Sequence, residues 1–332
     1  MAQSAGVVLL TLILVLIKRQ QNTAKPVERA SREEIHNAVD VNNIIRGGAE
    51  VKIFSFSRKI FIIFIYLRGI NVKCTFIKAR RSNMATGNPI VSVENLIVRY
   101  GERVVLDGVN AVISPSEIRV ILGGSGCGKT TLLRSIVGLI KPYSGRVRLF
   151  GRQIEDMESD ADSEILRRIG VLFQNGALLG SLTVAQNVAL PLELHTDLQP
   201  AIVDEIVRYK LSQVELPHAY GLFPGELSGG MRKRAALARA LALDPPLLFC
   251  DEPSAGLDPV TSAGLDQLLL RLRETLGITV IVVTHELFSI EKIADKILFL
   301  HKGKTLFDGL YTDARKIEDG PVADFFLRKE TA

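Results

Sequence analysis

The chain has 332 residues, of which 47% are apolar and 23% charged, a composition typical of a folded protein of one or two domains. Its three cysteines, Cys74, Cys127 and Cys250, form no CxxC pair, so neither a disulfide framework nor a zinc site is indicated and a reducing cytoplasm fits best. Residues 1–83 hold 14 Lys and Arg against 5 Asp and Glu, whereas residues 84–332 hold 27 against 31. The net charge of +5 therefore comes from the first quarter of the chain, and the rest lacks the positive surplus of a nucleic-acid-binding protein.

The first 83 residues are rich in apolar and basic residues without periodicity. The runs AGVVLLTLILVLI (5–17) and KIFIIFIYL (59–67) are shorter than the roughly 18 to 20 residues that span a bilayer. The first run also lacks the flanking features of a secretory signal, which leaves a short membrane-surface anchor as the functional alternative. We expect instead that Met84 is the natural start and that residues 1–83 are an upstream extension of the gene model.

From residue 90 the expected elements follow in regular order. Residues 90–101 and 103–114 alternate apolar and polar residues and predict two antiparallel strands. The apolar stretch IRVILG (118–123) predicts a buried strand, and a glycine loop and a helix beginning near Lys129 follow it. Further short strands are expected at 144–151 and 167–174.

Residues 175–244 lack strand patterning and predict an inserted helical subdomain. Helices are expected at 201–216 and after LSGG, with Pro191, Pro200, Pro217 and Pro224 as breaks. The alternation then resumes with strands at 247–252 and 278–286, helices near 260–276 and 287–294, and a strand hairpin at 296–309. Strands that alternate with helices predict an α/β fold with a mostly parallel sheet covered on both faces.

The loop before the first helix matches G-x-x-x-x-G-K-[ST], a phosphate-binding loop, with a buried strand before it and a helix after it. Its backbone N–H groups and the helix N-terminus attract phosphates, Lys129 reaches the β and γ phosphates, and the Thr130 hydroxyl can ligate Mg²⁺. Cys127 is interpreted as a non-catalytic filler of the loop, with a redox switch as the alternative. The candidate nucleotide-binding residues here are Gly123, Gly124, Ser125, Gly126, Cys127, Gly128, Lys129, Thr130 and Thr131.

Polar residues also follow three apolar strands, at the edge where α/β sheets bind ligands. Asp251 and Glu252 come directly after LLFC, so we expect Asp251 to hold Mg²⁺ and Glu252 to polarise the attacking water. Gln174 follows VLF and His285 follows VIVVT, and for both the alternative is a solvated turn residue. Tyr100 could stack on a nucleotide base, although a core tyrosine fits its spacing nearly as well.

Residues 226–245, ELSGGMRKRAALARALALDP, predict a second anion-binding helix start. Ser228 is expected to cap the helix, and Gly229 and Gly230 leave the amides of its first turn open to a phosphate. The basic run at 232–234 fits either a solvated helix face or contact with a partner. A single nucleotide would not need two phosphate sites in one chain.

These motifs, together with SAGLD at 254–258, occur in the order of an ABC transporter ATPase, which residues 90–310 resemble. The resemblance implies a RecA-like phosphate-loop core with an N-terminal antiparallel β subdomain and an inserted helical subdomain within residues 84–332. It implies ATP and Mg²⁺ as cofactors, and a homodimer in which Ser228, Gly229 and Gly230 of one subunit close over the ATP of the other. Its implied roles are Glu252 as catalytic base, His285 as γ-phosphate contact, Gln174 as sensor of Mg²⁺ and of the membrane partner, Asp258 as cross-dimer contact, Tyr100 as adenine platform, and Thr130, Gln174 and Asp251 as metal ligands.

Three stretches are similar to the ATPases of the Mla or MCE-type lipid transporters: residues 173–196, the GGM of 229–231 with the basic residues after it, and residues 320–330. This similarity implies phospholipid transport between membranes, from the cytoplasmic face of the inner membrane. It also implies an integral permease, an MCE-domain lipid-binding protein and a STAS-domain regulatory protein as partners. An ATPase for amino-acid, metal or drug transport is the alternative. A translation factor with two cassettes and a coiled-coil DNA-repair ATPase do not fit, because there is one cassette and Lys129 and Asp251 lie 122 positions apart without heptads between them.

Overall fold

The computed structural model describes residues 49–57, 60–67, 75–78, 88–154 and 164–327, which belong to two compact units, Met1–Ala85 and Thr86–Ala332. In the first unit, β1 (Ala49–Ser57), β2 (Ile60–Leu67) and β3 (Thr75–Lys78) form an antiparallel sheet. The apolar run 5–17 and Met84 lie outside the described residues. No helix in the described ranges is both long enough and apolar enough to span a membrane.

The second unit is built on a central sheet with the strand order β13-β12-β6-β11-β10-β9. Within this sheet, neighbouring strands from β9 to β12 are parallel, and β13 pairs antiparallel with β12. Every residue of β6, β10 and β11 is buried, as expected for strands covered on both faces. The predicted mostly parallel sheet is therefore confirmed. The strands are β6 (Ile118–Gly123), β9 (Ile169–Leu172), β10 (Leu247–Asp251), β11 (Thr279–Val283), β12 (Lys296–His301) and β13 (Lys304–Leu310).

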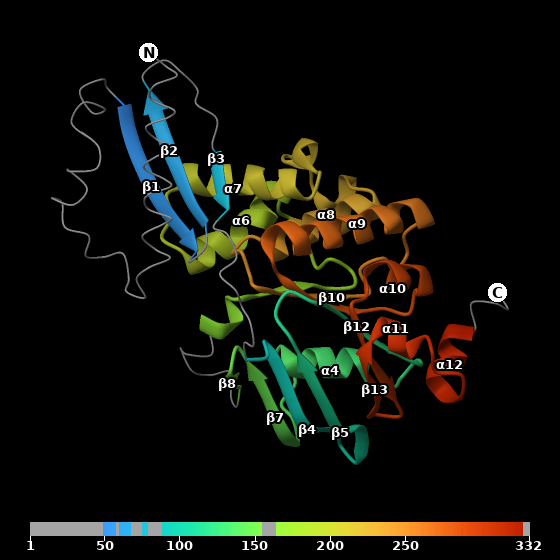
Figure 1. Ribbon diagram of the computed structural model, residues 1–332. Helices are drawn as coiled ribbons and strands as arrows, with labels where there is room; N and C mark the ends of the chain where they lie inside the picture. The colour runs from blue at the N-terminus through green and yellow to red at the C-terminus, as the bar shows by residue number, and fades with distance from the viewer. Residues whose placement is uncertain (1–48, 58–59, 68–74, 79–87, 155–163, 328–332) are drawn as a thin grey trace. The chain divides into compact units, whose positions relative to one another are not determined.

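A second, antiparallel sheet of this unit has the order β5-β4-β7-β8. Its strands are β4 (Val91–Tyr100), β5 (Arg103–Ile113), β7 (Ser144–Leu149) and β8 (Arg152–Gln153). Helix α4 (Lys129–Ile136) contacts strands of both sheets, and its buried apolar residues belong to the hydrophobic core that joins them. The core thus fixes α4, the helix that follows the glycine loop. Figure 1 shows α4 beside strands β4 and β5.

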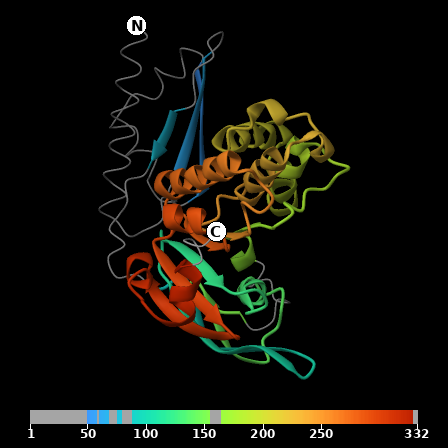
Figure 2. The ribbon, with the colours of Figure 1, turned by 90° about the vertical axis from the view of Figure 1, so that its right-hand side faces the viewer.

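Residues 175–244 are helical, as predicted, and form α6 (Val184–His195), α7 (Pro200–Gln213), the short 3₁₀ helices η2 (Pro217–Ala219) and η3 (Pro224–Glu226), and α8 (Gly229–Ala240). Figures 1 and 2 place α6, α7 and α8 at the end of this unit opposite the antiparallel sheet. The expectation that Pro191 breaks the helix is wrong, because it lies inside α6. A capping box of Thr183 and Gln186 begins α6, and its residues Val188 and Leu192 are fully buried, which offsets the missing backbone donor of the proline.

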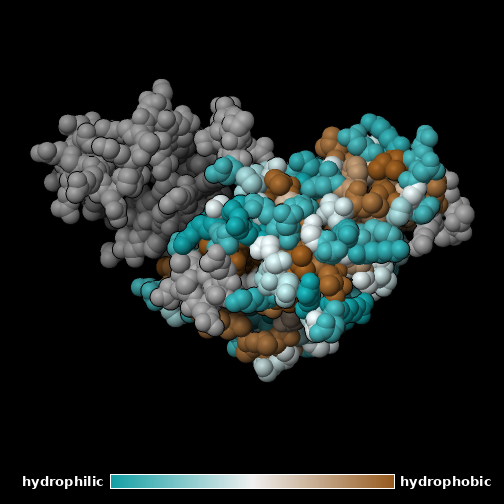
Figure 3. All heavy atoms as spheres, turned by 90° about the horizontal axis from the view of Figure 1, so that it is seen from below, coloured by the Kyte–Doolittle hydropathy of each residue, from teal (hydrophilic) through white to brown (hydrophobic). Residues whose placement is uncertain are grey.

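The remaining helices pack on the C-terminal part of the sheet. Helices α9 (Pro259–Leu276) and α10 (Leu287–Ile293) confirm two predicted elements, and the Ser289 hydroxyl of α10 donates to Asp266 of α9 at 2.9 Å. Short α11 (Tyr311–Ala314) and α12 (Gly320–Leu327) close the chain, with Phe325 packed edge-to-face on Phe299 of β12 at 5.6 Å between ring centroids. Figure 3 shows hydrophobic residues reaching one face of this unit in patches separated by hydrophilic ones, which is usual for a folded protein surface.

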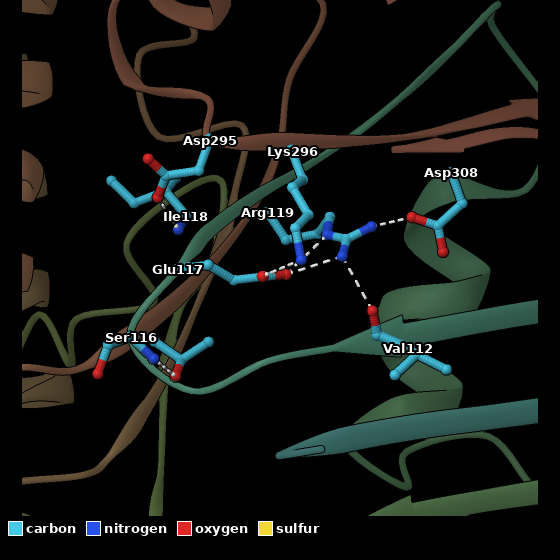
Figure 4. A network of polar contacts seen from close by, with 9 residues as sticks. Val112, Ser116, Glu117, Ile118, Arg119, Asp295, Lys296 and Asp308 are labelled. Carbon is cyan, nitrogen blue, oxygen red and sulfur yellow. Dashed lines mark hydrogen bonds and ion pairs between the residues drawn. The ribbon is translucent and has the colours of Figure 1, made fainter. Parts of the chain in front are cut away.

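A buried ion network ties four strands together at the N-terminal end of β6 (Figure 4). The guanidinium of Arg119, 2% exposed, donates to Glu117 at 2.8 Å and to the Val112 carbonyl at 2.9 Å, and pairs with Asp308. Lys296 binds the other oxygen of Glu117 at 2.8 Å. Strands β5, β6, β12 and β13 each contribute a group, so the β12–β13 hairpin is held against both sheets by charges as well as by strand pairing.

Candidate functional site

The glycine loop sits at the end of β6 in a conformation that side chains would obstruct. Gly123 has φ +144°, and a Cβ there would lie 2.1 Å from the carbonyl oxygen of Leu300. Gly128 has φ +105°, and a Cβ there would lie 2.5 Å from Cδ2 of Leu106. The two glycines required by the sequence motif are therefore required by the backbone and by the space around it.

The loop encloses a position suited to an anion. Helix α4 begins at Lys129, and no described side chain caps its N-terminus, so its first amides are open to a phosphate. Lys129 Nζ folds back over the loop and donates to the carbonyls of Gly123 at 2.9 Å and Gly124 at 3.1 Å. Within the loop, Gly124, Ser125 and Gly126 are exposed, and Thr130 and Thr131 lie in the first turn of α4.

Cys127 points away from this position and into the core, with 7% of its surface exposed. Burial raises the pKa of its thiol, although the nearby charge of Lys129 opposes that rise. A protonated, buried thiol reacts slowly with oxidants, so the structure favours a filler over a redox switch.

Two adjacent carboxylates end β10. Burial, and next the charge of Glu252, raise the pKa of Asp251, which is 8% exposed. Asp251 Oδ1 and Glu252 Oε2 are buried and have no hydrogen-bond partner among the described residues. Unpartnered carboxylate oxygens of this kind suit a cation that prefers oxygen ligands, such as Mg²⁺.

The described residues offer no group of three or more His, Cys, Asp or Glu side chains that could hold a metal without other ligands. Mg²⁺ binds proteins through one or two carboxylates and completes its shell with water and substrate phosphates. Asp251, the Thr130 hydroxyl and Gln174 are the predicted protein ligands. These assignments stay predictions.

Glu252 is held by its backbone in an uncommon conformation, with φ +47°. Its N–H donates to Val283 of β11 at 2.8 Å, which extends the pairing of the sheet by one residue. Its Oε1 lies 2.9 Å from Nδ1 of His285, the residue predicted to follow the neighbouring strand. The structure thus brings Glu252 and His285 together, and the second carboxylate oxygen of Glu252, Oε2, has no hydrogen-bond partner among the described residues.

Gln174 lies just beyond β9 with an exposed side chain. Its carbonyl accepts a hydrogen bond of 2.5 Å from Lys233 Nζ, which also donates to the carbonyl of Glu252 at 3.0 Å. Burial lowers the pKa of Lys233, and the charges of Cys250, Glu252 and Asp251 oppose this. Arg239 of the same helix donates to the carbonyls of Gly176 at 2.8 Å and Ala177 at 2.6 Å.

The solvated-face interpretation of residues 232–234 is therefore wrong for Lys233, which is 7% exposed. Arg234 is also partly buried, and binds the Val214 carbonyl at 3.0 Å and Glu215 at 2.7 Å. The sequence signal that could have shown this is the position of Leu237, because an apolar residue four positions after Lys233 lies on the same face of a helix and is buried here.

The start of α8 has the predicted cap. Ser228 accepts a hydrogen bond from the amide of Met231 at 3.3 Å. A Cβ on Gly230 would lie 2.4 Å from Cγ2 of Thr261, so α8 approaches the N-terminus of α9 closely at this point. Asp258 caps α9 by accepting from the amides of Val260 and Thr261, both at 3.0 Å. The start of α8, with Ser228, Gly229 and Gly230, therefore lies close to Asp258 at the start of α9.

Tyr100 ends β4 with 52% of its surface exposed, so the core alternative is wrong and the ring is free to contact a ligand. The phosphate loop, Asp251, Glu252 and His285 come from the ends of neighbouring strands β6, β10 and β11. The structure therefore gathers these residues at one edge of the sheet, where ligands bind in α/β proteins.

Comparison with known proteins places this arrangement in a family. Residues 106–255 match the family model described as ABC transporter. The chain is 39% identical, over 71% of its length and 89% of the relative, to the intermembrane phospholipid transport system ATP-binding protein MlaF of Haemophilus influenzae. It is 38% identical to the probable ribonucleotide transport ATP-binding protein mkl of Mycobacterium bovis, over 71% of this chain and 66% of that protein, and to the methionine import ATP-binding protein MetN of Brucella abortus, over 74% and 64%.

Solved structures agree with these relatives. The dimeric post-hydrolysis structure of the ATP-binding cassette MJ0796 bound to ADP and Pi is 33% identical, with a TM-score of 0.61 over 66% of this chain and 98% of that one. The cbiO1 structure from Clostridium perfringens, part of the ABC transporter complex cbiONQ, is 29% identical, with a TM-score of 0.63 over 74% and 93%. This chain belongs to the ABC transporter family, as an ATP-binding and ATP-hydrolysing subunit.

Proposed function

We propose that this ATPase subunit powers the transport of lipid, and of phospholipid in particular, between membranes. The observation that carries the proposal is the extent of the match to the phospholipid transport protein MlaF, which covers 89% of that relative. The ribonucleotide and methionine transport relatives are almost as similar in identity, but about a third of each lies outside the match. Residues 173–196, 229–231 and 320–330 support the same choice by their similarity to lipid-transport ATPases.

The proposed site binds ATP with its phosphates in the loop of residues 123–131 and its adenine against Tyr100. Thr130, Asp251 and Gln174 would hold Mg²⁺, which neutralises phosphate charge when bound. His285 already occupies one oxygen of Glu252, so the other, unpartnered oxygen is the one placed to accept a proton from the attacking water. In this arrangement His285 orients the base and also reaches the γ-phosphate.

The proposed assembly is a homodimer, because the chain carries one set of motifs and each ATP needs Ser228, Gly229, Gly230 and Asp258 from the other copy. We place the dimer at the cytoplasmic face of the inner membrane, bound to an integral permease, with an MCE-domain lipid-binding protein and a STAS-domain regulatory protein. Nucleic acid is not among the proposed partners. Residues 84–332 form the proposed ATPase domain, with residues 175–244 as the helical subdomain that transmits the change to the permease, and residues 1–83 are an extension.

Mass spectrometry of the assembly that co-purifies with a tagged Glu252→Gln variant from detergent-solubilised membranes tests the proposal. An MCE-domain protein, a permease and bound phospholipid are the expected partners. A different permease with a solute-binding protein for an amino acid, metal or drug would overturn the lipid assignment and leave the ATPase in place. Tagged Lys129→Ala serves as the control for nucleotide-dependent partners, because it is expected to lose ATP binding.

A further inference from the structure

Two cationic side chains of α8 attach the loop after β9 to that helix. Lys233 binds the carbonyl of Gln174, and Arg239 binds those of Gly176 and Ala177. A Cβ on Gly176 would lie 3.3 Å from Cβ of Ala236, so the loop backbone also packs directly on α8. The loop from residue 174 to residue 177 and α8 are therefore held as one piece.

Lys233 differs from Arg239 because its ammonium group also contacts a second segment of the chain. Nζ lies 2.5 Å from the carbonyl oxygen of Gln174 and 3.0 Å from that of Glu252, which belong to segments 59 and 19 residues away. The side chain is 7% exposed, so water does not compete freely for these donors. One ammonium group therefore joins the helix that begins at Ser228, the Gln174 loop and the residue that carries the predicted base.

The contact with Glu252 falls on a residue whose position depends on its backbone. Glu252 has φ +47°, a strained conformation for a residue with a side chain, and such a conformation persists where its surroundings hold it. The N–H is held by Val283, and the carbonyl is held by Lys233 and by the amide of Ala255 at 3.2 Å. The direction of the Glu252 carboxylate therefore depends on contacts from both sides, one of which comes from α8.

We propose that Lys233 is a positioning residue for ATP hydrolysis. It couples the position of α8 and of the loop at residues 174–177 to the orientation of the Glu252 carboxylate. The inference rests on the proposed role of Glu252 as the base. A displacement of α8 would shift the carbonyls of both Gln174 and Glu252. The Glu252 carboxylate is therefore correctly oriented only when α8 and the loop at residues 174–177 are both in the positions described here. Lys233 does not touch the reacting atoms and acts through the backbone of Glu252.

The test compares Lys233→Met, which keeps the length and apolar stem but removes the donors, with Lys233→Arg, which keeps charge and donors. Arg234→Gln is the matched control, because Arg234 is the next residue of the same helix and binds Val214 and Glu215 instead of the motif loops. Each full-length variant is assayed for kcat and KM for ATP, for nucleotide affinity, for thermal midpoint, and for amide hydrogen exchange across residues 174–177.

We expect Lys233→Met to lower kcat by about 10-fold to 100-fold with KM for ATP changed by less than about 3-fold, because the base is misaimed while the phosphate loop is untouched. Hydrogen exchange at residues 174–177 should rise, and Lys233→Arg should recover most of the lost kcat. Arg234→Gln should retain its kcat.

Two outcomes would overturn the inference: a kcat of Lys233→Met that equals that of the parent per folded molecule, or an equal loss of kcat in Arg234→Gln. If Lys233→Met does not fold, a Lys233→Gln variant that folds and keeps full kcat overturns it equally. Glu252→Gln, measured alongside, distinguishes failure of the role of Glu252 as the base from failure of the role of Lys233. Retained turnover in Glu252→Gln refutes the role of Glu252 and not the geometry of Lys233.

Discussion

Replacing Gly123 by alanine would place a Cβ atom 2.1 Å from the carbonyl oxygen of Leu300, in a backbone conformation with φ +144° that alanine rarely adopts. The neighbouring atom is backbone of β12 and cannot rotate away. We expect Gly123→Ala to lower the free energy of unfolding by about 2–4 kcal/mol, and to weaken ATP binding because the loop must shift. Urea unfolding and nucleotide titration measure both effects.

Gly124→Ala is the matched control, one residue further along the same loop. Its Cβ would have no atom within 4 Å, and its φ is not in the left-handed region. The free energy of unfolding should change by no more than about 0.5 kcal/mol. An equal loss of stability in both variants would contradict the view that the Leu300 contact sets the requirement for glycine.

The residues of the site differ in how well the sequence alone could find them. Lys129, Asp251 and Glu252 are marked by their immediate neighbours, because a glycine loop and an apolar strand end are local patterns. Lys233 and Arg239 contact carbonyls 59 to 63 residues away, and backbone carbonyls carry no sequence signature. A run of basic residues on a helix therefore looked equally suited to solvent until its partners were placed.

The buried network at Arg119 makes a prediction about how strands are held together. Arg119→Met removes a guanidinium that is 2% exposed and leaves Glu117 and Asp308 without one of their cations. Breaking a buried pair by removing one partner typically costs about 3–5 kcal/mol, and we expect a loss of that size in the free energy of unfolding. Chemical denaturation of the full chain measures it.

Arg148→Met provides the comparison. Arg148 pairs with Glu94 across the antiparallel sheet, but the two side chains are 36% and 40% exposed. An exposed pair contributes about 0–1 kcal/mol, so this variant should remain close to the parent. Similar losses in both variants would show that burial is not what gives the Arg119 network its effect.

The contact between α9 and α10 predicts a pH dependence. Burial raises the pKa of Asp266, although the hydrogen bond from Ser289 opposes this. The folded state then binds this proton more tightly than the unfolded state, so the stabilising contribution is present below the unfolded pKa of about 3.9 and is lost as pH rises through the raised folded pKa. Asp266→Asn removes that loss, and its thermal midpoint should gain on that of the parent as pH rises above about 4.

Asp258→Asn should show the opposite trend. Hydrogen bonds from Thr261 lower the pKa of Asp258, so its contribution is present above the unfolded pKa and is lost as pH falls. Its thermal midpoint should therefore gain on the parent toward low pH. Parallel pH profiles for the two variants would rule out these assignments.

Helices and strands were predictable where periodicity was regular. Strands β6, β10 and β11 are mostly apolar, with Arg119 inside β6 and Asp251 at the end of β10, and α9 has a clear start at Asp258 and Pro259. Helix α6 was not predicted, because Pro191 is normally a break and its compensation lies in a capping box and in burial that depends on the fold. Local preference thus failed where tertiary packing decided.

For the molecule as a whole, the single set of motifs predicts that ATP controls dimerisation. Glu252→Gln should bind ATP without hydrolysing it and accumulate as a closed dimer, and Lys129→Ala should lose nucleotide binding and stay monomeric with ATP. Light scattering of both variants with and without ATP measures this. Near-normal turnover in both variants would refute the site assignment.

The fold class was predictable because strands and helices alternate along the chain, but the strand order was not. Strand β6 lies between β11 and β12, more than 150 residues later in the chain, and pairs with both. Short apolar strands of similar length offer no pattern that selects such partners. The covering of the sheet, the chain connections and the buried charges of Arg119, Glu117 and Asp308 select the order together.

The unpartnered oxygens of Asp251 and Glu252 connect the concentration of ATP to the stability of the folded chain. A ligand that binds the folded state alone stabilises it by mass action, by about 2.7 kcal/mol when its concentration is 100 times its dissociation constant. A bound cation and nucleotide would do this while also neutralising two carboxylates that the fold leaves unsatisfied. The subunit should therefore resist unfolding and proteolysis better in an ATP-rich cell than in a starved one. Its abundance should then rise and fall with the cellular concentration of ATP.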